Sequence, residues 1–262
     1  MHVRPPAGNR GRPDISNRAM LVILCHAGDA AALWLHGAMR RLGVGALELV
    51  AMEQVVFSRS IVHRLDRVGD TGAIALADSR ILRVEEITGL VNRVQFLPTQ
   101  HFAAAAAIDR AYATEELGAL MLAWLDGVAG RVINPALPSA LGGSAFPEIA
   151  IVHSAAMAGL PTRSWRLDDA TTDDDRDAMH SPTHAPIVLD GRLFGPSIPA
   201  HLGEGCRRLA VLLGAPLLQV LFHHSAEAEW RFVGATGFAD FRIGGDPLAA
   251  AMAQAFGSDR AE

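Results

Sequence analysis

The feature that most constrains the fold is a short apolar run followed by a helical pattern and a second apolar run. Residues 19–25 (AMLVILC) form a compact apolar stretch, as expected of a buried parallel strand. Asp29 is placed to cap a helix over residues 30–42, and the run ALELVAM then predicts a second strand. A strand–helix–strand unit predicts a parallel sheet, so the chain begins as an α/β protein.

The rest of the chain predicts three regions. Residues 1–18 are rich in proline, glycine and arginine and predict a mobile tail. Further strand-like runs complete an α/β lobe over residues 19–101. Residues 102–262 predict a helical middle, with two helices at 103–111 and 114–127, and then an α+β lobe.

The C-terminal lobe has clear local signals. Asp190 and Gly191 between two short apolar runs predict a hairpin. The stretch HLGEGCRRLAVLLG predicts an amphipathic helix, and PLLQVLFHH and EWRFVGA predict two strands. Asp246 and Pro247 are typical of a helix N-terminus, so the chain is expected to end in a helix over DPLAAAMAQAF.

Composition excludes several kinds of chemistry. All 23 basic residues are arginine, so no lysine is available for a Schiff base or a P-loop. The formal net charge of −5 argues against a nucleic-acid partner, because counterion release needs a basic face. No apolar run has the roughly 18 residues of a membrane-spanning helix. Cys25 and Cys206 show no CxxC spacing and predict buried, reduced thiols in a cytoplasmic protein.

Four stretches carry a resemblance to a known family. They are MLVILCHAGDAAALWLHGAMRRLG, then SRILRVEEITGLVNRVQFLP, then AYATEELGALMLAWLDGVAGRVINPALPSA followed by EIAIVHSAAMAGLPTRSW, and finally CRRLAVLLGAPLLQVLFHHSAEAEWRFVGATGFADFRIGGDPLAAAMAQAF. In this order they resemble ATP-grasp carboxylate–amine ligases of the RimK and glutathione-synthetase type, especially those that modify peptides. The resemblance implies a pre-ATP-grasp-like α/β lobe, a helical middle and a truncated ATP-grasp-like C-terminal α+β lobe. Within this frame we predict four binding residues: Arg93, Asn134, Arg163 and Arg231.

The departures from this family concern its nucleotide and its metal. Residues 165–195 are too few for the family's nucleotide-binding lid, and they contain an acidic loop. The family's magnesium ligands are an Asp, a Glu and an Asn, and the corresponding positions here hold Leu221, Gly234 and Thr236. Magnesium needs hard oxygen ligands, which Leu and Gly do not supply. We therefore expect no cofactor, and in particular neither ATP nor Mg²⁺.

These departures predict a non-catalytic pseudo-ligase that binds a peptide or a partner protein in peptide or natural-product modification. Self-association into a homo-oligomer is a further expectation. Two enzymatic alternatives stay open. One is a residual ATP-dependent carboxylate–amine ligase, and the other is a metal-dependent enzyme that has repurposed the cleft between the lobes.

Histidines carry the metal alternative. The densest group of metal-ligand residue types is His223, His224 and Glu229, with Zn²⁺ or iron as the metal. Adjacent histidines on a strand point to opposite faces, which argues against one shared ion. His180 and His184 offer a second pair for zinc. The six aspartates within residues 168–177 predict a solvated acidic loop, with a cation site as the alternative.

Overall fold

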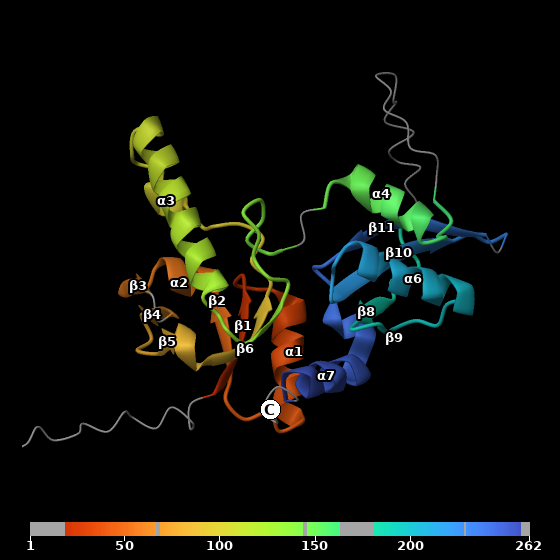
Figure 1. Ribbon diagram of the computed structural model, residues 1–262, viewed down its shortest axis with the longest axis horizontal. Helices are drawn as coiled ribbons and strands as arrows, with labels where there is room; N and C mark the ends of the chain where they lie inside the picture. Colours follow the sequence, from red (N-terminus) through yellow and green to blue (C-terminus); the bar gives the residue numbers. More distant parts are fainter. Residues whose placement is uncertain (1–18, 67–68, 144–145, 163–180, 228, 258–262) are drawn as a thin grey trace, which may run out of the picture.

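The computed structural model describes residues 19–66, 69–143, 146–162, 181–227 and 229–257. The chain forms two lobes, each built on a four-stranded sheet, and a small three-stranded sheet flanks the N-terminal lobe. Figure 1 shows the N-terminal lobe and the C-terminal lobe side by side, with α1 and α7 between them. The α/β architecture expected from the sequence is confirmed.

The N-terminal sheet is parallel throughout, with strand order β2-β1-β6-β7. Its strands are β1 (Met20–Cys25), β2 (Leu47–Ala51), β6 (Ile87–Asn92) and β7 (Arg131–Ile133). The crossover from β1 to β2 is α1 (Ala30–Arg41), which begins at the predicted cap Asp29. β1 is almost wholly buried because it lies in the interior of this sheet, which explains its continuous apolar run.

The flanking sheet is an antiparallel meander of order β3-β4-β5. Its strands are β3 (Ser60–Asp66), β4 (Gly69–Ala75) and β5 (Ile81–Arg83), preceded by the short α2 (Met52–Val56) and followed by the 3-10 turn η2 (Val84–Glu86). Ile74, Leu82 and Val84 are buried in one core with Val22 and Leu90 of the parallel sheet, so this meander closes one face of that sheet.

The middle of the chain contains one long helix, so the prediction of two helices is wrong. After the 3-10 turn η3 (Gln100–Phe102), α3 runs without interruption over Ala107–Asp126. No glycine or proline lies between residues 111 and 114, and alanine favours propagation, so nothing breaks the helix at the expected point. Only its C-terminal end is buried, through Met121, Trp124 and Leu125.

The C-terminal lobe is built on an antiparallel sheet of order β11-β10-β8-β9. The strands are β8 (Ile187–Leu189), β9 (Arg192–Phe194), β10 (Leu217–His224) and β11 (Trp230–Thr236). Its helices are α4 (Glu148–Met157), α6 (Ala200–Leu212) and α7 (Phe241–Gly257). The hairpin at Asp190 and Gly191 is confirmed, with φ of 48° and 73° at its two turn residues.

The last helix contains a kink at the predicted N-terminus. Gly245 has φ of 62° and ψ of −165°, which interrupts α7 and separates a short first segment from the helix that follows. Asp246 and Pro247 directly follow this break, where the sequence places the start of the final helix.

A single apolar core joins the two lobes. It contains Ile23 and Leu35 of the N-terminal lobe together with Leu217, Phe241 and Met252 of the C-terminal lobe. β7 lies beyond residue 101 and yet pairs with β6 in the N-terminal sheet. The domain boundary at residues 101 and 102 stays a prediction. No helix in the described part of the chain is long and apolar enough to cross a membrane.

Candidate functional site

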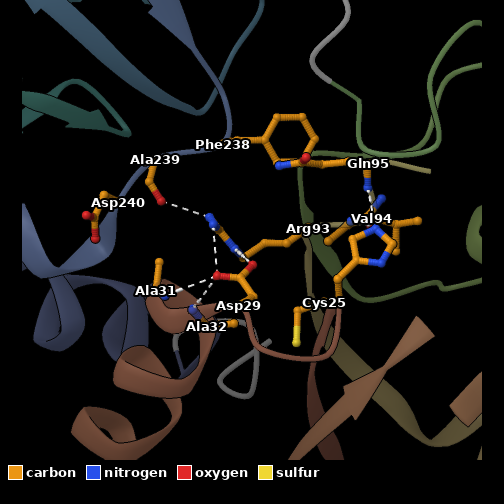
Figure 2. Close-up of polar contacts among 12 residues, drawn as sticks. Cys25, Asp29, Ala31, Ala32, Arg93, Val94, Gln95, Phe238, Ala239 and Asp240 are labelled. Carbon is orange, nitrogen blue, oxygen red and sulfur yellow. Dashed lines mark hydrogen bonds and ion pairs between the residues drawn. The ribbon is translucent and has the colours of Figure 1, made fainter. Parts of the chain in front are cut away.

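The candidate site lies where the carboxyl ends of the parallel strands meet the C-terminal lobe. β1 and β6 are neighbours in the sheet, and the connection from β1 runs to β2 on the other side. Open α/β sheets bind ligands at such a switch point, outside the carboxyl ends of the strands. Here the segment 237–240, which follows β11, lies against this edge (Figure 2).

Arg93 and Asp29 form a largely buried ion pair at this switch point. Arg93 follows β6, and its Nε lies 2.7 Å from Oδ2 of Asp29, while its Nη2 lies 3.3 Å from Oδ1. The side chain of Arg93 is 6% exposed and that of Asp29 is 15% exposed. Arg93 also donates from Nη1 to the carbonyl of Ala239 at 2.8 Å and lies over the ring of Phe241. One guanidinium therefore connects the two lobes, as Figure 2 shows.

Asp29 has a second function as the N-cap of α1. Its Oδ1 accepts hydrogen bonds from the backbone N–H groups of Ala31 and Ala32, at 3.1 and 3.0 Å. Burial opposes ionisation of this carboxyl, but the hydrogen bonds from Arg93 and from the two amides outweigh it. The pKa of Asp29 is therefore lowered below its usual range, and the pair is charged at neutral pH.

Two asparagines extend the network beside this ion pair. Asn134, which follows β7, donates from Nδ2 to the carbonyls of Asn92 (3.3 Å) and Gly237 (3.0 Å). Asn92 donates to the carbonyls of Asn134 and Leu141. Asn134 is buried and has φ of 58°, a left-handed conformation that asparagine tolerates better than most residues. Asn134 therefore also ties the N-terminal sheet to the segment after β11.

His26 is a residue of this edge that the sequence analysis missed. Its Nε2 accepts a hydrogen bond from the N–H of Gln95 (3.1 Å), its Nδ1 lies 3.2 Å from Oε1 of Glu53, and its ring stacks on Phe96. Because Nε2 accepts from the backbone, Nδ1 is the nitrogen that carries a proton toward Glu53. His26 directly follows β1, and Glu53 lies in α2 two residues after the end of β2. This shared position beyond two neighbouring parallel strands was the available signal.

Cys25 lies at the same edge and has no nucleophilic character. The thiol is buried, and burial together with the nearby carboxylate of Asp29 raises its pKa to about 12. A thiol with this pKa is protonated at neutral pH, and only the thiolate is a strong nucleophile. The site therefore offers no activated cysteine.

The positions that the resemblance assigns to magnesium ligands lie together on the C-terminal sheet. Leu221 of β10 lies directly opposite Gly234 of β11, and Gln219 lies opposite Thr236 in the same register. The positions that the resemblance assigns to magnesium ligands therefore lie on one face of the C-terminal sheet, because paired residues share a face. Leu221 and Gly234 have no side-chain oxygen, so we derive no reaction step through a metal ion at these two positions.

The predicted metal residues are close in sequence but diverge in the structure. His224 stacks on Trp230 with ring centroids 4.4 Å apart. The ring of His184 meets the ring of His224 edge-on, with centroids 5.7 Å apart. The His223 Nδ1 lies 3.1 Å from the carbonyl of Ser181. Glu229 is an exposed residue just before β11. Within the described residues no three His, Cys, Asp or Glu side chains gather as a metal site.

The remaining predicted residues are only partly described. Arg231 is paired with His223 in the β10–β11 register, on the strand rather than at the switch point. Arg163, His180 and the acidic residues 168–177 lie outside the described residues. Of the four predicted binding residues, the structure brings Arg93 and Asn134 to one edge and keeps Arg231 apart. The assignment of all seven predicted site residues stays a prediction.

Comparison with known proteins assigns the fold to one class. No protein-family model matches the chain, and no curated protein matches it. Solved structures do match, and they show the fold of ATP-grasp ligases that modify peptides, as the resemblance implied.

Three solved structures illustrate the similarity. The macrocyclase MdnC from Microcystis aeruginosa MRC, bound with the precursor peptide MdnA, is 10% identical, with a TM-score of 0.68 over 90% of this chain and 99% of that chain. A Chryseobacterium gregarium RiPP-associated ATP-grasp ligase, in complex with ADP and a leader and core peptide, is 8% identical, with a TM-score of 0.66 over 93% and 97%. The ATP-grasp ligase PsnB, complexed with minimal precursor, Mg and ADP, is 15% identical, with a TM-score of 0.59 over 91% and 97%.

These structures correct the expectation about cofactors. The sequence analysis expected no cofactor, and specifically neither ATP nor Mg²⁺, with Zn²⁺ or iron as the alternative. That expectation is wrong, because ATP-grasp ligases of this fold are solved with ADP, and PsnB is solved with magnesium as well. The expectation had rested on three ligand positions, on the length of residues 165–195 and on the absence of lysine.

Proposed function

We propose that the protein binds a peptide and acts in peptide or natural-product modification as a non-catalytic partner. The observation that carries peptide binding is the match of at least 90% of the chain to two ATP-grasp chains solved with a precursor or a leader and core peptide. A fold alone does not define a function, so the lack of catalysis has to be argued from the residues of this chain.

The absence of catalysis is supported by the β10–β11 register. Leu221 lies opposite Gly234 at the positions where the resemblance implies acidic ligands, and neither side chain carries an oxygen. Phosphoryl transfer depends almost wholly on positioned positive charge and metal ions. We therefore propose that the chain does not catalyse ligation, whether or not it binds a nucleotide.

The junction between the lobes supports a rigid binding frame. Arg93, Asp29 and Asn134 direct their hydrogen bonds to other parts of the protein. A buried pair of this kind stabilises one arrangement of the surrounding segments, and peptide binding gains affinity when the receptor is already ordered. We assign these residues to holding the lobes in place.

Selection from a random peptide display library on the purified full-length chain tests peptide binding. Selected peptides are synthesised, and their binding is measured by fluorescence anisotropy. We expect peptides that bind with a Kd below about 100 µM. A library that yields no such peptide would overturn the proposal that this chain is a peptide-binding protein.

Catalysis is tested on the same complexes. Each selected peptide is incubated with the chain, ATP and Mg²⁺, and peptide mass and ADP release are followed together. We expect an unchanged peptide mass and no peptide-dependent ADP release. Loss of one water mass per new bond would identify a residual ligase and overturn the non-catalytic assignment.

Two further expectations belong to the same proposal. Self-association is checked by sedimentation velocity over a range of protein concentrations, where a constant monomer mass would contradict it. A cytoplasmic location is checked by cell fractionation of the producing host, where recovery outside the cytoplasmic fraction would contradict it.

A further inference from the structure

A hollow on the outer face of the C-terminal lobe has the properties of a docking surface. It lies along α4 and α6, which pack together on the side of the molecule away from the N-terminal lobe (Figure 1). Its volume is about 330 Å³, and its lining residues are Met157, Glu204, Arg207, Arg208, Val211 and Leu212. We call this set the α4–α6 groove.

The apolar residues of the groove are open to solvent. Val211 is 79% exposed, Met157 is 65% exposed and Leu212 is 48% exposed. Exposed apolar side chains that occur singly are normal on a protein surface, but here three of them line one hollow. Contiguous apolar surface beside charged residues is typical of a site that binds another chain.

The charged residues of the groove are held in fixed positions. Arg207 donates from Nε to the carbonyl of Gly191 and from Nη1 to Glu204. Arg208 donates from Nε and Nη2 to the carbonyl of Ala158, which caps the end of α4. Ordered guanidinium groups lose little side-chain entropy when a partner binds, so they are well suited to recognise carboxylates.

The net positive charge of the groove favours a partner that carries carboxylates. Two guanidinium groups, Arg207 and Arg208, share the single carboxylate of Glu204 in this groove. Arg207 also lines a second hollow, which includes Phe194, Pro196 and Ile198. An excess of positive charge therefore lies beside the apolar side chains of the α4–α6 groove, and its complement is a segment with carboxylates next to apolar side chains.

We propose that the α4–α6 groove binds an acidic amphipathic segment of the peptide partner. Apolar side chains of this segment pack against Met157, Val211 and Leu212, and its carboxylates lie beside Arg207. The inference rests on the proposed peptide-binding function and adds to it the place and the chemistry of recognition.

Two synthetic helical peptides test this inference on the full-length chain. They carry leucine at the same positions, and one has glutamate where the other has lysine. Fluorescence anisotropy is expected to detect binding of the glutamate peptide and none of the lysine peptide. Raising the salt concentration is expected to weaken binding of the glutamate peptide, because exposed charges are screened.

Variants locate the site. Val211→Asp is expected to weaken binding about tenfold or more, since it replaces an apolar contact with a charge that repels the acidic peptide. Arg207→Gln is expected to weaken it several-fold and to reduce its salt dependence. Ile108→Asp is the matched control, because Ile108 is 80% exposed and lies on α3 in the other lobe. This control is expected to leave binding unchanged.

The outcomes separate this inference from the proposed function. Equal binding of the glutamate and lysine peptides, or equal effects of Val211→Asp and Ile108→Asp, would overturn the α4–α6 groove as the site. If library-selected peptides bind and ignore Val211→Asp and Arg207→Gln, the groove is wrong while peptide binding stands. If no library peptide and neither synthetic peptide binds, the proposed function itself fails.

Discussion

Arg93 and Asp29 are 64 residues apart in the sequence and form a largely buried ion pair with an Nε–Oδ2 distance of 2.7 Å. The same arginine donates to the carbonyl of Ala239 in the C-terminal lobe, and the same aspartate caps α1. The switch point of the parallel sheet, which in many α/β proteins receives a ligand, is here occupied by the chain itself. Three predictions follow from this junction, and a fourth follows from the burial of the two cysteines.

Removing the charge of Asp29 should destabilise the protein strongly. Asp29→Asn keeps a good N-cap for α1 but leaves the Arg93 guanidinium buried without its counter-charge. Loss of one partner of such a pair is expected to lower the free energy of unfolding by about 3 kcal/mol, measured by urea denaturation.

The matched control for this change is Asp246→Asn. Asp246 pairs with Arg41 at 3.4 Å, but both side chains are largely exposed. Exposed pairs contribute about 0.5 kcal/mol, so this variant should unfold close to the parent protein. Similar losses of unfolding free energy in both variants would show that the Arg93–Asp29 pair contributes no more to stability than an exposed pair.

The same pair should make stability depend on acid pH. The pKa of Asp29 is lowered in the folded state, mainly because hydrogen bonds from Arg93 and two amides outweigh the effect of burial. A lowered folded pKa stabilises the protein above the unfolded value of about 3.9. This contribution is lost as the pH falls through the folded pKa.

Denaturation midpoints measured between about pH 6 and pH 3 test this dependence. The parent protein should lose stability below about pH 4, and Asp29→Asn should show a shallower decline over the same window. Parallel curves for the two proteins would assign the acid sensitivity to other carboxylates, such as Glu53, whose pKa is also lowered.

Asn134 should be sensitive to substitution for two separable reasons. Its side chain donates two hydrogen bonds, and its backbone has φ of 58°. Asn134→Gly removes the hydrogen bonds and keeps the conformation accessible, whereas Asn134→Ala also adds strain of about 1 kcal/mol. Thermal unfolding should therefore rank the parent above the glycine variant, and the glycine variant above the alanine variant. An alanine variant as stable as the glycine variant would contradict the backbone argument.

The two cysteines should be unreactive in the native protein. Burial raises the pKa values of Cys25 and Cys206 to about 12, so neither thiol forms a thiolate near neutral pH. Labelling with a thiol reagent at about pH 8 should be slow in buffer and rapid for both residues in denaturant. Fast labelling of one cysteine in buffer would show that its surroundings open locally.

Much of the fold could be predicted because its signals are local. The apolar run of β1, the cap Asp29, the turn residues Asp190 and Gly191 and the start at Asp246 each depend on a few neighbouring residues. The prediction of two helices in the middle was wrong because residues 111–114 contain no local signal that ends a helix. The resemblance to ATP-grasp ligases was confirmed as a fold, and the inference it led to about ATP and Mg²⁺ was wrong.

The candidate site was less predictable, because it depends on which strands become neighbours. The sequence by itself determined the α/β class, the hairpin at Asp190 and Gly191, the starts of the first and last helices, and the residue types at the β10–β11 positions. Only the tertiary structure decided that Arg93 reaches Asp29 and Ala239, that Asn134 reaches Gly237, and that His26 meets Glu53. The physical reason is distance along the chain: periodicity and capping act within a few residues, whereas these contacts require a sheet order and a packing of lobes that bring remote segments together.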